Sequence, residues 1–167
     1  MPAPPTPDPA TGEDAIARLD DRRIELLGMV LEVHNELLNA TQRGLEASAD
    51  LPVQWLGVLI RLARSPGQRL RMTELARDMT MSTSGLTRLV DRIEAAGLVQ
   101  RQPCAEDRRG LLAVLTDEGR SVLTSAAPCH LADLERYLDP ALSAEEQQLL
   151  IDLLRRVRDH VRASATP

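Results

Sequence analysis

The sequence predicts a mainly α fold of the α+β class, with a small helix–turn–helix and hairpin unit between long helices. Three observations predict it. In the long segments at both ends of the 167-residue chain, apolar residues recur at steps of three and four, the period of an amphipathic helix. Two short apolar runs, "LVQRQ" and "LLAVLT", flank a polar, turn-prone segment, as the strands of a β-hairpin do. Aromatic residues are scarce, with one Trp, one Tyr and no Phe, so the core must consist of aliphatic side chains, which suits packed helices.

The chain begins with a proline-rich arm followed by two helices. Residues 1–15 have five prolines among the first nine positions and are predicted to be disordered. Within the segment 16–50, a long helix is predicted from Ile16 to about Leu45. Its apolar stripe consists of Leu27, Val30, His34, Leu37 and Leu38. The run "PVQWLGVLIRLARS" predicts a second helix with Pro52 in its first turn, where proline is favoured.

The middle of the chain, residues 51–116, is predicted to form the compact unit. "SPGQ" is a turn, and the following "RLRM" predicts a short strand. Thr73 is predicted to be the N-cap of a brief helix, 74–79. "TSGLTRLVDRIEAA" then predicts a helix over 83–96, which Gly97 ends in the left-handed conformation.

The hairpin follows that helix. Its strands are predicted at 98–102 and 111–116, and "PCAEDRRG" at 103–110 forms a projecting tip between them.

Two further helices are predicted within residues 117–162. Pro128 is expected to kink or divide the first of them. "SAEE" at 143–146 is a Ser-x-x-Glu capping box that opens the second, which reaches about Val161 before a flexible tail, 163–167.

The apolar stripes of these long helices need a partner. The stripes in 16–50 and 117–162 are longer than so small a middle could cover, and a second copy of the chain is the simplest partner. The sequence therefore predicts a homodimer whose dimerisation helices are the N-terminal one and the two C-terminal ones.

Charge is segregated along the chain. The formal net charge is −5, yet residues 69–110 contain eight arginines against six aspartates and glutamates. This segregation of charge is expected when the basic region of a protein binds an anion and the rest of its surface contacts a different kind of partner.

The helix predicted at 83–96 separates its side chains by type. Stepping 100° per residue from Leu86 groups Leu89, Val90 and Ile93 on one side. The opposite side carries Ser84, Thr87, Arg88, Asp91, Arg92 and Ala95. Such a face fits the DNA major groove, where arginine pairs with guanine and hydroxyl groups bond to bases or phosphates. A solvated surface helix with Ser82 as its N-cap has the same pattern, so this segment alone leaves both interpretations open.

The neighbouring segments favour the DNA interpretation. A short capped helix precedes this one, and a hairpin with "DRR" near its tip follows. Basic residues at a hairpin tip can reach the minor groove, where the negative potential is strong.

These features together resemble the winged helix–turn–helix of the MarR family of bacterial transcriptional regulators. The resemblance covers about residues 16–162 and is carried by "TELA", "TRLVDRIEAAGLV", the wing "DRR" and "LTDEGR". It implies an obligate dimer that binds a pseudo-palindromic DNA operator, with recognition helix 83–96 in the major groove and wing 103–110 beside it. The resemblance thus implies a sequence-specific repressor, released by a small-molecule effector in many members of the family. A winged-helix protein-interaction module without specific DNA binding is the alternative.

The resemblance also assigns roles to individual residues. Those expected to bind DNA are Thr73, Ser82, Ser84, Thr87, Arg88, Arg92, Arg108 and Arg109. Asp91 and Asp107 are expected to brace the wing, Asp107 as the first residue of the D-x-R pair and Asp91 by orienting Arg109.

An effector pocket is much less explicit in the sequence. His34 and Trp55 are its candidates, although a histidine on an apolar stripe and a lone tryptophan are more often core or interface residues. Because the first cysteine is Cys104, the chain lacks the N-terminal cysteine through which some family members sense oxidants.

Other chemistry is not indicated. Cys104 and Cys129 have no CxxC spacing, and adjacent side chains such as Cys129 and His130 diverge by about 100° on a helix, which makes them poor joint metal ligands. No cofactor motif, glycine-rich phosphate loop or nucleophile with a base is present, so an enzyme is not expected. Neither a signal peptide nor an apolar run of membrane-spanning length is found, and a cytoplasmic protein is expected.

Overall fold

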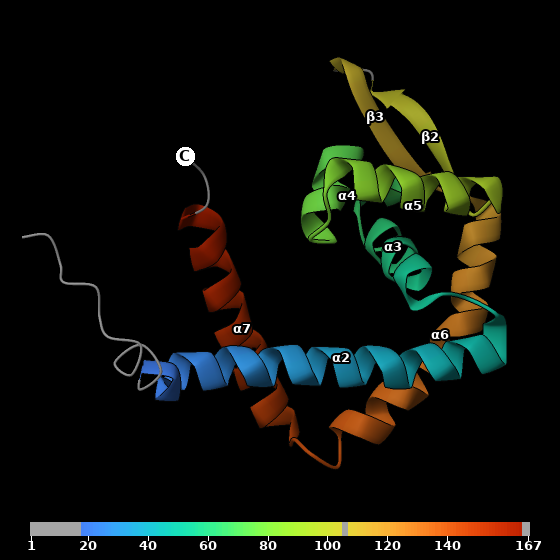
Figure 1. Ribbon diagram of the computed structural model, residues 1–167. Coiled ribbons are helices and arrows are strands. Elements are labelled where there is room, and N and C mark those ends of the chain that lie inside the picture. Colours follow the sequence, from blue (N-terminus) through green and yellow to red (C-terminus); the bar gives the residue numbers. More distant parts are fainter. Residues whose placement is uncertain (1–17, 105–106, 165–167) are drawn as a thin grey trace, which may run out of the picture. The chain divides into compact units, whose positions relative to one another are not determined.

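The computed structural model of the protein describes residues 18–104 and 107–164, and only the backbone at residues 18, 48, 49, 108 and 109. The chain divides into two compact units, one ending at Asn39 and the other beginning at Ala40. The first holds a short 3-10 helix, η1 (Arg18–Asp20), and most of α2 (Arg22–Ala49). The second holds the end of α2 and all later elements (Figure 1).

Helix α2 starts later than the sequence predicts. It begins at Arg22 and not at Ile16, because the Asp21 carboxylate caps it by accepting a hydrogen bond from the backbone N–H of Arg23 at 2.8 Å. The same carboxylate accepts a second bond from Nε of Arg23 at 2.8 Å. The side-chain bond, followed by the backbone bond, lowers the pKa of Asp21. Residues 1–17, with the predicted arm, lie outside the described part of the chain.

The lobe, residues 53–115, contains the helix–turn–helix and the hairpin. Its elements are α3 (Val53–Ala63), η2 (Pro66–Gln68), β1 (Arg69–Arg71), α4 (Met72–Asp78), α5 (Thr83–Ala95), β2 (Val99–Cys104) and β3 (Asp107–Leu115). The three strands form an antiparallel sheet in the order β1-β3-β2, which makes β2 an edge strand. Pro52 is the N-cap of α3, one position before the predicted first turn.

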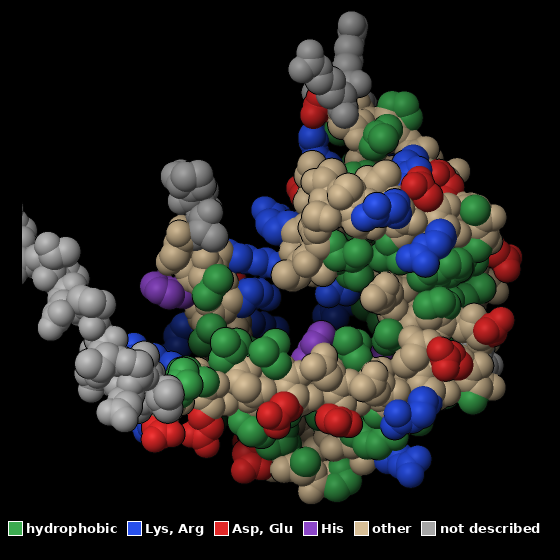
Figure 2. Space-filling view, in the orientation of Figure 1, with side chains coloured by type: hydrophobic (Ala, Val, Ile, Leu, Met, Phe, Trp, Pro, Cys, Tyr) green, Lys and Arg blue, Asp and Glu red, His purple; other side chains and the backbone are tan. Residues whose placement is uncertain are grey.

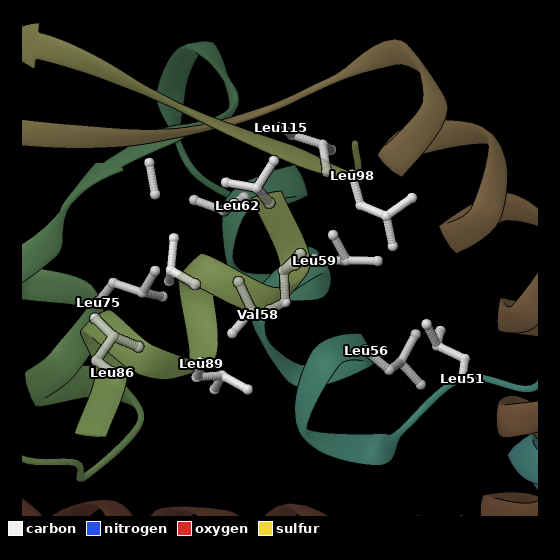
Figure 3. Close-up of a cluster of buried hydrophobic side chains, with 14 of the residues drawn as sticks. Leu51, Leu56, Val58, Leu59, Leu62, Leu75, Leu86, Leu89, Leu98 and Leu115 are labelled. Atoms are coloured by element: carbon white, nitrogen blue, oxygen red, sulfur yellow. The ribbon is translucent and has the colours of Figure 1, made fainter. Parts of the chain in front are cut away.

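The core of the lobe is aliphatic, as the scarcity of aromatic residues predicts (Figure 3). It is built from the buried faces of α3, α4 and α5 and the inner residues of the sheet. The largest fully buried side chains of the lobe are Leu56, Val58, Leu59, Leu62, Leu75, Leu86, Leu89, Val90, Ile93 and Val99. Each such side chain contributes about 1.5–3 kcal/mol when it leaves water, so this cluster fixes how α5 lies on α3 and α4.

The hairpin strands are longer than predicted. The sequence places the tip at 103–110, whereas β2 extends to Cys104 and β3 begins at Asp107, with Cys104 opposite Asp107 across a register shift. Turn-prone composition is misleading here, because Pro103 lies on an edge strand, where a missing backbone N–H is tolerated. Residues 105 and 106 lie outside the described part.

Helix α4 also begins earlier than predicted. Its N-cap is Arg71, so the prediction of Thr73 as N-cap is wrong and Thr73 lies in the first turn. The reason is local: the Glu74 carboxylate accepts a hydrogen bond from the backbone N–H of Arg71 at 3.3 Å, which satisfies one of the free donors of the first turn.

Helix α6 (Asp117–Leu138) starts against the corner between α5 and β2. Its N-cap is Thr116, whose hydroxyl accepts a bond from the N–H of Gly119 at 2.9 Å and donates one to the carbonyl oxygen of Gly97 at 2.7 Å. A Cβ at Gly119 would lie 2.0 Å from the carbonyl oxygen of Leu98. Only glycine therefore allows this close approach of α6 to the corner.

Pro128 does not divide α6. The helix is continuous from Asp117 to Leu138 with Pro128 inside it, so the prediction of a division is wrong, and whether the proline kinks the axis stays a prediction. Packing of the helix on both sides of the proline outweighs the lost hydrogen bond. Ala126 is buried in the core cluster, and Cys129 is half-buried beside Gly44, to whose carbonyl oxygen its thiol donates at 3.6 Å.

Helix α7 (Ala144–Ser164) confirms the predicted capping box. The backbone N–H of Ser143 donates to the Glu146 carboxylate at 2.8 Å, and the N–H of Glu146 donates to the Ser143 hydroxyl at 3.3 Å. The bond from the backbone N–H of Ser143, followed by the interaction of the carboxylate with the Ser143 side chain, lowers the pKa of Glu146. The helix reaches Ser164, past the predicted end near Val161 and into the segment expected to be a flexible tail.

Candidate nucleic-acid interface

Helix α5 has the buried and exposed faces that the sequence predicts. Leu86, Leu89, Val90 and Ile93 are buried in the core of the lobe. Ser82 is the N-cap and accepts a bond from the N–H of Gly85 at 3.1 Å.

The predicted left-handed stop at the end of α5 is confirmed. Gly97 has φ of +78°, and its N–H donates to the carbonyl oxygen of Glu94 at 2.8 Å.

The outward face of α5 presents two arginines that have no partner among the described residues. Arg88 and Arg92 are exposed, and neither is hydrogen-bonded nor ion-paired to any residue that the structure describes. Figure 2 shows arginine side chains on the surface over this helix. A guanidinium group held on a helix surface with all its donors facing solvent is suited to bond guanine edges or phosphates.

The hydroxyl groups on this face are partly engaged. Ser82 and Ser84 are exposed, and their oxygens lie 3.3 Å apart. The hydroxyl of Thr87 donates to the carbonyl oxygen of Thr83 at 2.8 Å, which leaves it able to accept but not to donate without rotating. Because phosphate is an acceptor, the donors for it must come from the arginines or from rotated hydroxyls.

A cavity of about 340 Å³ lies between α4, α5 and the hairpin. Its lining brings together predicted DNA-binding residues from both helices, Thr73 and Thr87, with Arg71 and Arg101 of the strands and Gly110 of β3. The structure thus places the outward face of α5 next to the hairpin, as a winged helix requires. The hairpin β2–β3 is called the wing below.

Arg101, in β2, is the most highly connected residue at this place. Its Nη1 donates to Glu94 Oε2 at 3.0 Å, and its Nη2 lies 2.6 Å from Asp91 Oδ1 and donates to the carbonyl oxygen of Thr87 at 3.0 Å. The backbone N–H of Arg101 donates to Glu94 Oε1 at 2.7 Å. This residue is not among the site residues predicted from the sequence. A signal for it was the awkward pair of carboxylates, Asp91 and Glu94, one turn apart on a helix expected to meet DNA.

The wing contains the predicted bracing residue Asp107 and the predicted wing arginines, whereas the other predicted bracing residue, Asp91, lies on α5. Asp107, the first residue of β3, forms an ion pair with Arg71 of β1 at 3.4 Å, and its bracing role stays a prediction. The described partner of Asp91 is Arg101. Arg108 and Arg109 lie in β3, but their side chains are outside the described part, so the Asp91–Arg109 contact stays a prediction.

The two candidates for an effector pocket lie in different surroundings. Trp55 is half-buried on α3 and packs against the core of the lobe, and its part in a pocket stays a prediction. His34 is exposed on α2, so it is not a core histidine of the single chain, and its pocket and interface interpretations stay predictions.

Cys104 is the last residue of β2, and Cys129 and His130 lie on α6. Cys104 is buried and Cys129 half-buried, and both are free thiols. Burial lowers the pKa of His130, and the charge of Asp133 partly opposes this shift. Among the described residues no group of three or more histidines, cysteines and carboxylates is placed to hold a metal ion. None of the helices so described is long and apolar enough to cross a membrane.

Known proteins show the same combination of elements. The sequence model of the MarR family matches residues 49–110. An uncharacterized HTH-type transcriptional regulator from Bacillus cereus is 30% identical over 118 residues, which are 71% of this chain and 77% of that protein. Sco3205, a MarR family transcriptional regulator from Streptomyces coelicolor solved in complex with DNA, is 34% identical and covers 92% of this chain and 91% of its own, with a TM-score of 0.74. A mutant MarR from Escherichia coli complexed with operator DNA is 26% identical over 81% of this chain and 95% of its own, with a TM-score of 0.71.

The lobe is therefore a winged helix–turn–helix, with α5 as the second helix of the helix–turn–helix. The chain belongs to the MarR family and is a transcriptional regulator.

Proposed function

We propose that the protein is a homodimeric, sequence-specific DNA-binding repressor that places one α5 in each half-site of a pseudo-palindromic operator. The observation that carries the proposal is the outward face of α5, where Arg88 and Arg92 are exposed and unpaired within the described chain, beside the wing. Relatives of known structure, Sco3205 and MarR, were solved with DNA, which supports DNA as the partner. A dimer bound over a promoter would repress by occupying it.

The dimer in this proposal is supported by apolar surface that the single chain leaves open. On α7 alone, seven large apolar side chains are between 40% and 59% exposed. These are Leu149, Leu150, Ile151, Leu153, Leu154, Val157 and Val161. On α2, residues from Ile24 to Val33 include a comparable set (Figure 2). So much exposed apolar surface on each of these helices is typical of an interface, and a symmetric dimer would cover it with the same surface of a second copy.

The proposed DNA contacts are tested by two substitutions. Arg88→Ala should weaken binding to DNA selected by the wild-type dimer by about 10- to 100-fold and relax preference at the base it contacts, as expected for a base-contacting arginine. Arg108→Ala should weaken binding similarly for all sequences and reduce its salt dependence, as expected for a phosphate contact. Affinity is measured by fluorescence anisotropy over a salt series, followed by footprinting.

The matched control is Arg155→Ala, which removes the same charge from the exposed side of α7. If both lobe variants footprint the operator as the wild type does, the assigned face is wrong. If the wild-type dimer gives no retarded band on any selected DNA in excess nonspecific competitor, the protein-interaction alternative is favoured.

A further inference from the structure

We propose that Arg101 is a positioning residue that locks the wing to the recognition helix, so that both elements meet DNA as one rigid body. The inference rests on the proposed DNA-binding function and deepens it. It starts from the contacts of a single guanidinium, which reaches three acceptors on α5: Glu94, Asp91 and the carbonyl oxygen of Thr87. The backbone N–H of Arg101 adds a fourth contact, to Glu94.

The environment of Arg101 differs from that of a DNA-contacting arginine. Its side chain is only 20% exposed, whereas Arg88 and Arg92 are exposed and unpaired in the described chain. Two carboxylates outweigh its single positive charge, so the cluster as a whole does not attract phosphate. A planar guanidinium is suited to holding several acceptors in fixed directions, which a point charge cannot do.

The arrangement explains how the wing keeps its angle to α5. The near end of the wing is joined to α5 through the chain at Gly97, whose left-handed corner is a natural pivot. The acceptors that the Arg101 guanidinium contacts belong to residues from Thr87 to Glu94, which span about two turns of α5. Because one planar group holds acceptors from successive turns in fixed directions, it resists both sliding and rotation of β2 on α5. Since β2 pairs with β3 along its length, the whole wing is held.

A charge-removing variant gives opposite results for a positioning residue and for a direct DNA contact. Glu94→Gln removes a negative charge close to DNA and frees part of the Arg101 guanidinium. If Arg101 positions the wing, this variant should bind operator about five- to tenfold more weakly, because the wing is loosened. If Arg101 instead contacts phosphate, the same variant should bind more tightly, and that result would overturn the proposal.

A double-mutant cycle measures the coupling itself. When Arg101 is present, Arg108→Ala should remove the whole contribution of this wing contact to operator affinity. In an Arg101→Met background, the loss of affinity caused by Arg108→Ala should be about fivefold smaller. Arg101→Lys keeps the charge without the planar fork and should restore little of the coupling. The control is Arg120→Met, which removes an arginine from an exposed ion pair on α6 and should leave the cost of Arg108→Ala unchanged. Additive effects of Arg101→Met and Arg108→Ala, or full rescue by Arg101→Lys, would contradict the lock.

A measurement without DNA separates this inference from the proposed function. Hydrogen exchange of the DNA-free protein should be about tenfold faster at the backbone amides of 99–104 in Arg101→Met than in the wild type, with little change in the α3 amides. Unchanged exchange in β2 would refute the lock even if the protein binds its operator. Faster exchange would support the lock even if the wild type binds no DNA and the proposed function fails.

Discussion

Arginines on the same lobe serve two different purposes, and their partners separate them. Arg88 and Arg92 extend from α5 without a partner among the described residues, which suits them to an external anion. Arg101 and Arg71 are directed inward to carboxylates, at 2.6 Å to Asp91 and 3.4 Å to Asp107. The ion pair of Arg71 is largely exposed and contributes little by itself, whereas the enclosed contacts of Arg101 act together.

At the residue scale, His130 is expected to make stability depend on pH. It lies on α6, and its Nδ1 is buried without a hydrogen-bond partner in the part of the chain that the structure describes, as is Oδ2 of Asp133. Burial holds the pKa of His130 below its ordinary value of 6.5, although Asp133 partly opposes the shift. Between the folded pKa and 6.5 the unfolded chain therefore binds more protons than the folded chain. The free energy of unfolding should fall as the pH falls through this window, and below the window His130 should add no further pH dependence.

Urea denaturation at fixed protein concentration, at about pH 8 and at about pH 5, checks this expectation by comparing the wild type with His130→Gln. The variant should lose part of the pH dependence. His160→Gln, which changes an exposed histidine of α7, is the control. A variant with the same pH dependence as the wild type would exclude His130 as the cause.

At the element scale, features that depend on neighbours in sequence could be predicted, and features that depend on neighbours in space could not. The buried face of α5 follows from the helical period, and the Ser143–Glu146 capping box needs only four residues. The lock at Arg101 joins β2 to carboxylates seven and ten residues earlier, a distance that no local pattern reveals. The early start of β3 was not predicted, because the polar composition of this segment suggested a turn. Pairing with β2 makes it a strand instead.

Helix α6 offers an element-scale prediction, because Pro128 interrupts its hydrogen bonding and is exposed. Proline within a helix costs about 3 kcal/mol, of which about 1 kcal/mol is offset by the reduced freedom of the unfolded chain. Pro128→Ala should therefore raise the free energy of unfolding by about 1–2 kcal/mol. Ser125→Ala, at another exposed position of the same helix, should change it by about 0.5 kcal/mol or less.

Urea denaturation of both variants measures the difference. Equal or lower stability of Pro128→Ala would mean that the fold of α6 is adapted to the proline, for example through a kink that packing requires.

At the scale of the whole molecule, the proposed dimer depends on α7. Val157 is 56% exposed and lies on the apolar side of that helix. Val157→Arg places a charge where the proposed interface excludes water, and removing an unpaired charge from water costs several kcal/mol. The variant should be largely monomeric in sedimentation and should bind a palindromic operator much more weakly, because only one lobe remains per molecule.

The control for the dimer is Gln148→Arg, which adds the same charge on the polar side of α7, beside Asp152. It should remain dimeric. A Val157→Arg protein that sediments as a dimer would show that this face of α7 is not the interface.

Because the core is aliphatic, tryptophan fluorescence reports on only one part of the molecule. Trp55 is the single tryptophan of the sequence, and it packs against the core of the lobe. Selective excitation of tryptophan therefore reports the unfolding of the winged lobe, while the aliphatic faces of α2 and α7 carry no such chromophore. Comparing that emission with circular dichroism, which detects all the helices, would show whether the lobe and the long helices lose their structure in one step or in two.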